Sequence, residues 1–299
     1  GWERAKKLDL GVDLTLFRNW NITFDYFREN RYNILLHREA WPESLGYYTA
    51  KPWSNLGKVR NSGIEFSTTY RQAIAKDFSM EVRGNFTYTA NKYIEADEPK
   101  YDLPWLSTEG RPLSYTYGYI AEGLFRSQDE IDHSPLQDFG STPQVGDIKY
   151  KDINGDNIID TDDQMVISQY GGTPRIQYGF GLNLFYKKFD FGMFFNGSAK
   201  RTLMISGIHP FGTGDNNIFQ FIADDYWTES NPNANAKYPR LGLLDTETSN
   251  NKQNSTYWMR NGNFIRFKTL ELGYTFKYGR AYFNCDNVAV FSPFKHWDP

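Results

Sequence analysis

Residues 176–199 read IQYGFGLNLFYKKFDFGMFFNGSA. In the first half of this stretch, apolar positions alternate with polar or glycine positions: Ile176, Tyr178, Phe180, Leu182 and Leu184 against Gln177, Gly179, Gly181 and Asn183. Successive side chains of a β-strand point to opposite faces, so the pattern predicts a strand with one apolar and one polar face. Two lysines then separate it from a second aromatic-rich run, which predicts an antiparallel pair joined by a tight turn.

Three further pairs of runs share this design. The eight expected strands are 8–17, 20–29, 61–71, 78–89, 176–186, 189–199, 263–276 and 281–291. Aromatic residues such as Phe17 and Trp20 bracket each short turn. Long polar excursions separate the pairs, at residues 30–60, 90–175 and 200–262. Short turns on one side, long loops on the other and aromatics at strand ends predict an outer-membrane β-barrel.

Strand length and composition favour a membrane barrel over a soluble β-sandwich. Strands of about 9–11 residues cross a bilayer at a tilt, whereas strands of soluble domains typically have about 5–6. Aromatic residues make up 17% of the chain, and Tyr and Trp favour membrane interfaces. No apolar run approaches the ~18 residues of a membrane helix. The net charge of −3 argues against nucleic-acid binding, and a lone cysteine, Cys285, excludes an internal disulfide.

The order of turns and loops gives the expected orientation. If the short turns face the periplasm, all three excursions lie outside the cell. Their length is too great for a small closed tube, so we expect an all-β arc of a larger antiparallel transmembrane barrel. Its apolar face should contact lipid and its polar face should line a wet lumen. We expect Leu14, Phe24, Val82 and Leu182 to face lipid, and Asp13, Asp25, Arg83 and Asn183 to face the lumen.

The two ends of the sequence indicate that the chain is a segment of a longer protein. The chain opens at Gly1-Trp2-Glu3 without a signal peptide, and it stops shortly after Phe291. An outer-membrane protein has to be exported. We therefore expect the chain to be an interior piece.

An acidic stretch, residues 152–163, fits a calcium loop. Oxygen ligands at the required spacing come from Asp152, Asn154, Asp156, the Ile158 carbonyl, Asp160 and Asp163. Asn157 stands where such loops usually have glycine, and Asp163 stands where they usually have a bidentate Glu. The alternative is an acidic turn whose side chains bond their own backbone. With calcium, we expect the ion rather than a hydrophobic core to hold excursion 90–175. No other cofactor is expected.

Loop aromatics are the candidate substrate-binding residues: Trp41, Trp53, Tyr226 and Trp227. They suit stacking on sugar rings or gripping a peptide, and they equally suit packing the loops together or contacting a lid. The sequence shows no catalytic constellation, and His37, His133, His209 and His296 stand singly. We therefore expect no enzyme activity.

Several stretches carry a family resemblance over essentially the whole chain. They are WERAKKLDLGVDL (2–14), EGRPL (109–113), GDIKYKDINGD (146–156), KYPRL (237–241) and YWMRNG (257–262). In this order they resemble SusC/RagA-type TonB-dependent transporters of the Gram-negative outer membrane. The resemblance implies a plugged barrel of about 22 strands that imports oligosaccharides or peptides. It also implies TonB as the energy-relaying partner, through parts outside this chain, and a SusD-like surface lipoprotein as a lid.

Two other classes of function remain open from the residues alone. One is a binding or adhesion barrel that displays its loops without active transport. The other is a small self-contained barrel, either porin-like or enzymatic. A plug and a TonB-contacting segment in the parent protein would favour import over both.

Overall fold

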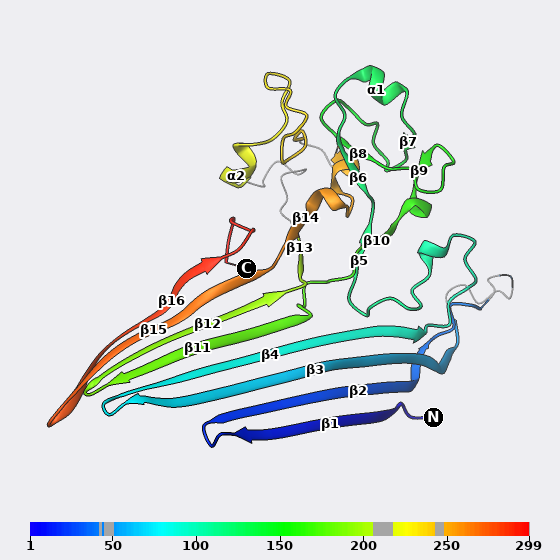
Figure 1. Cartoon of the computed structure of the whole chain (residues 1–299). Helices are drawn as coiled ribbons and strands as arrows, with labels where there is room; N and C mark the ends of the chain where they lie inside the picture. The colour runs from blue at the N-terminus through cyan, green and yellow to red at the C-terminus, as the bar shows by residue number, and fades with distance from the viewer. Residues whose placement is uncertain (42–43, 45–50, 206–217, 243–247, 299) are drawn as a thin grey trace.

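The eight long strands form one antiparallel sheet in the computed structural model (Figure 1). The structure describes residues 1–298 except 42–43, 45–50, 206–217 and 243–247. The sheet order is β1-β2-β3-β4-β11-β12-β15-β16, so sequence neighbours among these strands pair with one another. The strands are β1 (Arg4–Leu16), β2 (Trp20–His37), β3 (Trp53–Ala75), β4 (Phe78–Glu95), β11 (Ile176–Tyr186), β12 (Phe189–Ala199), β15 (Phe264–Phe276) and β16 (Gly279–Phe291).

The observed strand bounds differ from the expected ones mainly at one end. β11 and β12 have the bounds that alternation indicates, whereas β2, β3 and β4 continue well past them. Most of their extra residues lie at the end opposite the short turns (Figure 1), and β3 also continues through residues 72–75 beside its short turn. Both faces of a strand meet water beyond the bilayer, so pairing continues there while the apolar–polar alternation is lost. The first excursion is shorter than expected for this reason.

The register separates the two faces as the sequence indicates. Leu182 pairs with Val82 on β4 and with Met193 on β12. The same cross-strand rows place Leu14 and Phe24 on this apolar face, and Asp13, Asp25, Arg83 and Asn183 on the opposite one. Asn183 donates from Nδ2 to Glu81 Oε1 at 3.2 Å on that polar face. The apolar face of such an arc is the one that meets lipid.

The second and third excursions fold into small elements of their own. Their two-stranded sheets are β5 (Thr116–Gly118) with β10 (Met165–Ser168), β6 (Ala121–Leu124) with β8 (Ile148–Tyr150), β7 (Leu136–Gln137) with β9 (Ile158–Ile159), and β13 (Thr202–Met204) with β14 (Met259–Asn261). Short helices are η2 (Pro104–Leu106), α1 (Gln128–Asp132), η3 (Thr161–Asp163), α2 (Gln220–Ala223), η4 (Ser249–Lys252) and η5 (Thr256–Trp258). None of these short strands joins the eight-stranded sheet.

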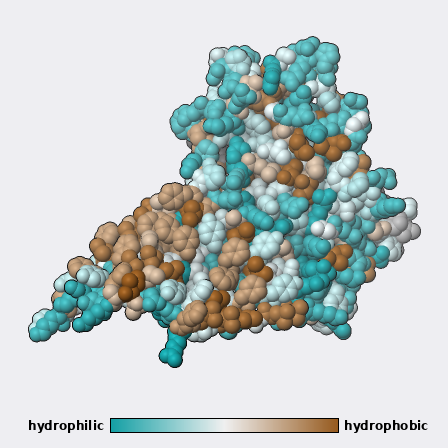
Figure 2. All heavy atoms as spheres, in the orientation of Figure 1, coloured by the Kyte–Doolittle hydropathy of each residue, from teal (hydrophilic) through white to brown (hydrophobic). Residues whose placement is uncertain are grey.

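Hydrophobic and hydrophilic residues separate along the molecule. Figure 2 shows hydrophobic residues gathered over the strands toward the short turns, and mostly hydrophilic residues over the excursions at the top. Among the described residues, no helix is long and apolar enough to cross a membrane.

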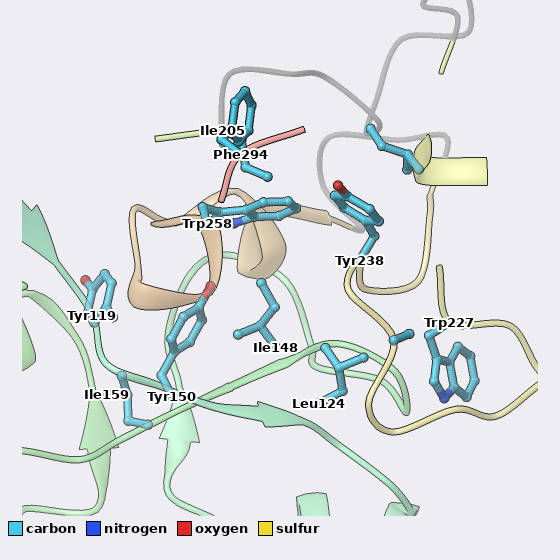
Figure 3. Close-up of a cluster of buried hydrophobic side chains, with 12 residues drawn as sticks. Tyr119, Leu124, Ile148, Tyr150, Ile159, Ile205, Trp227, Tyr238, Trp258 and Phe294 are labelled. Atoms are coloured by element: carbon cyan, nitrogen blue, oxygen red, sulfur yellow. The ribbon is translucent and has the colours of Figure 1, made fainter. Parts of the chain in front are cut away.

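The buried hydrophobic cluster of the chain lies in the excursions rather than against the sheet. Its members come from the second and the third excursion, with Phe294 from the segment after β16, and include Tyr119, Ile148, Tyr150, Tyr238 and Trp258 (Figure 3). We call this packed unit the loop body: residues 116–168 and the described residues of 202–258. The expectation that an ion would replace a hydrophobic core in excursion 90–175 is wrong, because Ile148, Tyr150 and Ile159 are each at most 1% exposed.

Candidate functional site

Aromatic residues of the second and third excursions pack together inside the loop body. Tyr119 and Tyr150 of the second excursion lie with their ring centroids 5.4 Å apart. Trp258 of the third excursion lies 6.4 Å from Tyr238, and its Nε1 donates to the Asn251 carbonyl at 2.9 Å. The Tyr150 hydroxyl donates to the Asn250 carbonyl at 2.8 Å, which links the second excursion directly to the third. The two excursions therefore pack as one body.

A buried ion pair reinforces this junction. Arg240 Nε lies 2.7 Å from Asp147 Oδ1, and Asp147 is fully buried. Asn251 Nδ2 donates to the same carboxylate at 2.7 Å, and the Gln144 N–H donates at 2.8 Å. Burial raises the pKa of Asp147, and the Arg240 guanidinium opposes that rise. Such a pair contributes little net stability, but removing one partner leaves an uncompensated buried charge.

Buried amides extend the network. Gln137 Nε2 donates to Asn250 Oδ1 at 2.5 Å, and Asn250 Nδ2 donates to the Ile148 carbonyl at 2.8 Å. The Ile148 N–H in turn donates to Asn251 Oδ1 at 2.9 Å. Both asparagines are fully buried. Buried polar groups of this kind are stable only when they are paired, so the amides fix how the two excursions meet.

Sequence reasoning assigned no role to these polar residues. Asp147 and Arg240 stand inside the quoted stretches GDIKYKDINGD and KYPRL, yet they are 93 residues apart. Neither periodicity nor local spacing reveals such a contact. A charged residue within a motif was the only signal that pointed to them.

The candidate residues Tyr226 and Trp227 line a cavity of about 630 Å³ on the loop body. Trp227 is only 7% exposed, and its ring lies against Gly146, where a Cβ atom would approach it to 2.2 Å. Gly146 has a φ of +89°, which also favours glycine. Trp227 is therefore mainly a packing residue, whereas Tyr226 is half-buried beside it.

The other two candidates lie at the outer ends of β2 and β3. Trp41 lines a separate cavity of about 560 Å³, and the Arg38 guanidinium lies 5.7 Å from the centre of its ring. Trp53 is 60% exposed, and its ring centre lies 3.7 Å from that of His37, with the two ring planes tilted by 40°. No contact among the described residues joins these two tryptophans to Tyr226 and Trp227. The structure thus divides the four candidates between two places.

Glu98 is an anionic residue in the lining of the Trp41 cavity. Burial raises the pKa of Glu98, but hydrogen bonds from the Ser107 and Thr108 side chains and from the Thr108 and Glu109 N–H groups outweigh it. The net effect is a lowered pKa, so the carboxylate stays charged. Aromatic and anionic groups in one open cavity suit a polar ligand with an apolar or cationic part.

The acidic stretch 152–163 folds as a hydrogen-bonded turn. Asp152 accepts from the Gly155 and Asn157 N–H groups at 2.6 and 2.9 Å. The fully buried Asp163 accepts from Ile153 at 2.6 Å and from Asp160 at 3.0 Å. Asn157 adopts the left-handed conformation, with a φ of +66°.

This arrangement matches the alternative of an acidic turn that bonds its own backbone. Among the described residues, no group of three or more His, Cys, Asp or Glu side chains is placed to hold a metal ion. A carboxylate oxygen that accepts one N–H bond keeps a second lone pair. The oxygens of this turn could therefore still coordinate a calcium ion. Calcium binding by Asp152, Asn154, Asp156, Ile158, Asp160 and Asp163 stays a prediction.

Calcium dependence is testable on the exposed part of this turn. If calcium binds, a chelator should speed proteolysis of residues 153–159 while the barrel strands stay protected. Asp156→Ala should reproduce the chelator effect, because it removes a central oxygen ligand. The control is Asp129→Ala, an exposed acidic residue on α1. Identical protease sensitivity with and without chelator would contradict calcium binding.

Comparison with known proteins shows which proteins this chain is similar to in sequence. No family model matches. The chain is 27% identical, over its full length, to TonB-dependent receptor P3 of Formosa agariphila, and covers 30% of that protein. It is 24% identical over its full length to TonB-dependent receptor SusC of Bacteroides thetaiotaomicron, again 30% of that protein. The chain thus spans about three tenths of these relatives.

A solved structure agrees with the sequence relatives. The RagAB peptide importer in its open-open state aligns with 98% of this chain at a TM-score of 0.67 and 18% identity, over 32% of the importer chain. The expected all-β arc of a large transmembrane barrel is confirmed by this fold. Together with the relatives, it makes this chain similar over its full length to part of the SusC/RagA-type TonB-dependent receptors, which are outer-membrane proteins of Gram-negative bacteria.

Proposed function

We propose that this chain forms part of an outer-membrane transporter that imports oligosaccharides or peptides with energy supplied through TonB. The observation that carries the proposal is the full-length match to receptors named TonB-dependent, combined with a fold shared with a peptide importer. An arc of spanning strands supplies the wall of the passage. The open cavities beside Trp41 and Tyr226 offer places where a ligand enters from outside.

A SusD-like surface lipoprotein is the proposed partner at the loop body. The buried Asp147–Arg240 pair and the amides of Asn250 and Asn251 hold the two excursions as one unit. A lid that opens and closes needs such a firm surface to rest on. Affinity-tagged complete receptor should therefore copurify with a lipoprotein, and the Asp147→Ala variant should copurify with less of it.

Growth experiments test transport in the native bacterium. Deleting the complete receptor gene should abolish growth on one class of polymer, either a peptide digest or a polysaccharide, and disabling TonB should have the same effect. The class lost identifies the substrate. An adhesion barrel would instead bind labelled polymer at the cell surface and leave growth unchanged, which would contradict the proposal.

A further inference from the structure

Positive side chains line a cavity where the two excursions meet the sheet. The cavity has a volume of about 400 Å³, and Lys200, Arg201 and Arg260 lie in its wall. No Asp or Glu is among the described residues that line it. Arg175 stands next to it, because its N–H donates to the Lys200 carbonyl at 3.3 Å. We call these four residues and the space between them the rim pocket.

The cations of the rim pocket lack anionic partners within the part of the chain that the structure describes. Their hydrogen bonds go to neutral carbonyls: Arg201 Nε to Gly172 at 2.8 Å, Arg260 to Tyr257 at 2.7 Å, and Arg175 to Gln169 at 2.9 Å. Other cations of the outer half, such as Arg38, Lys149 and Arg240, are paired with carboxylates. Four like charges gathered without a counter-charge favour a bound anion.

Aromatic and hydroxyl groups hold the pocket in shape. The Lys200 ammonium lies 5.1 Å from the centre of the Tyr88 ring and 5.9 Å from that of Tyr170. Arg175 covers Tyr170 at 5.3 Å. Lys200 has a φ of +55°, an uncommon conformation for a residue other than glycine. In the wall, the buried hydroxyls of Ser168 and Thr202 hydrogen-bond each other at 2.6 Å and keep this side of the pocket ordered.

The register places Tyr88, over which Lys200 lies, on the lipid side of the sheet near the outer membrane surface. Tyr88 pairs with Ile176, in the same face as Val82 and Leu182. β11 has 11 residues between the short turn and the pocket, and about 9–11 residues cross a bilayer. Tyrosines are enriched at that level, next to lipid headgroups. Lys200 therefore stands where the apolar band ends.

We propose that the rim pocket binds a phosphate group of an outer-leaflet glycolipid. Guanidinium groups pair with phosphate oxygens through parallel hydrogen bonds, and an ammonium adds a point charge. A lipid phosphate is favoured over an anionic nutrient because Lys200 lies over a residue of the lipid-facing side. The proposal uses the outer-membrane location of the chain and does not depend on transport.

Native mass spectrometry of the complete purified receptor tests the proposal. The probes are bisphosphorylated lipid A and the same lipid after removal of its phosphates. We expect the receptor to retain the phosphorylated lipid at least tenfold more than the dephosphorylated one. The triple variant K200Q/R201Q/R260Q should lose that preference. A matched variant, K151Q, removes an exposed cation elsewhere in the second excursion and should keep it.

Two outcomes would overturn the proposal. Equal retention of both lipids by the unmodified receptor would show that phosphate is not recognised. Displacement by millimolar inorganic phosphate, without any lipid preference, would assign the pocket to a soluble anion instead. Unfolding is checked by the heat-dependent gel mobility of the barrel, and the single variant K200Q repeats the measurement if the triple variant does not fold.

Discussion

Trp258→Ala is expected to destabilise the loop body by about 3–5 kcal/mol, the usual range for truncating a buried tryptophan. Trp258 is 1% exposed, and its ring meets Tyr257 edge-on at 5.4 Å. The substitution also leaves the buried Asn251 carbonyl without the indole donor, which adds to the loss. Hydrogen exchange on the complete receptor should report the change as faster exchange at residues 148–150 and 250–258, with β11 and β12 unaffected.

Trp53→Ala is the matched control for that measurement. It removes the same side chain from a position that is 60% exposed and contacts His37 at 3.7 Å. Little cavity forms at an exposed site, so exchange in the loop body should not change. If Trp258→Ala also left exchange in the loop body unchanged, the excursions would not share one core.

The strands were predictable because membrane crossing imposes a pattern on the sequence. β11 alternates between lipid-facing residues such as Leu182 and polar-face residues such as Asn183, and its bounds follow from that alternation. The outer parts of β2 and β3 were missed because no lipid contacts them. Backbone pairing outside the bilayer requires no alternation of apolar and polar side chains. Residues such as Asn33 and Asn55 were therefore assigned to a loop, although they lie in β2 and β3.

The loop body was not predictable from local patterns. Its core unites residues such as Ile148 and Trp258 that lie far apart in sequence and belong to short, irregular elements. The candidate Trp227 was recognised as an aromatic loop residue, but only the fold shows that it is buried on Gly146. The rim pocket had no sequence signal either, because Arg175, Lys200 and Arg260 meet only after both excursions return to the sheet.

Leu182→Arg is expected to destabilise the barrel by about 2–4 kcal/mol, as for a cation on the lipid face near the bilayer midplane. Leu182 lies in the middle of β11 and is flanked by Val82 and Met193 on the same face. An arginine there meets lipid on one side and apolar side chains on the others. Urea-dependent folding of the complete receptor into lipid vesicles should show a lowered midpoint.

Asn183→Arg separates the effect of the face from the effect of the substitution. Asn183 lies one residue further along the same strand at nearly the same depth, but its side chain points to the polar face beside Glu81. A guanidinium at this position lies beside a carboxylate and faces a wet lumen. The free energy of folding should therefore change by less than about 1 kcal/mol. Equal losses from the two arginines would mean that both faces of β11 are dry, and a larger loss at Asn183 would mean that the lipid-facing and lumen-facing sides are reversed.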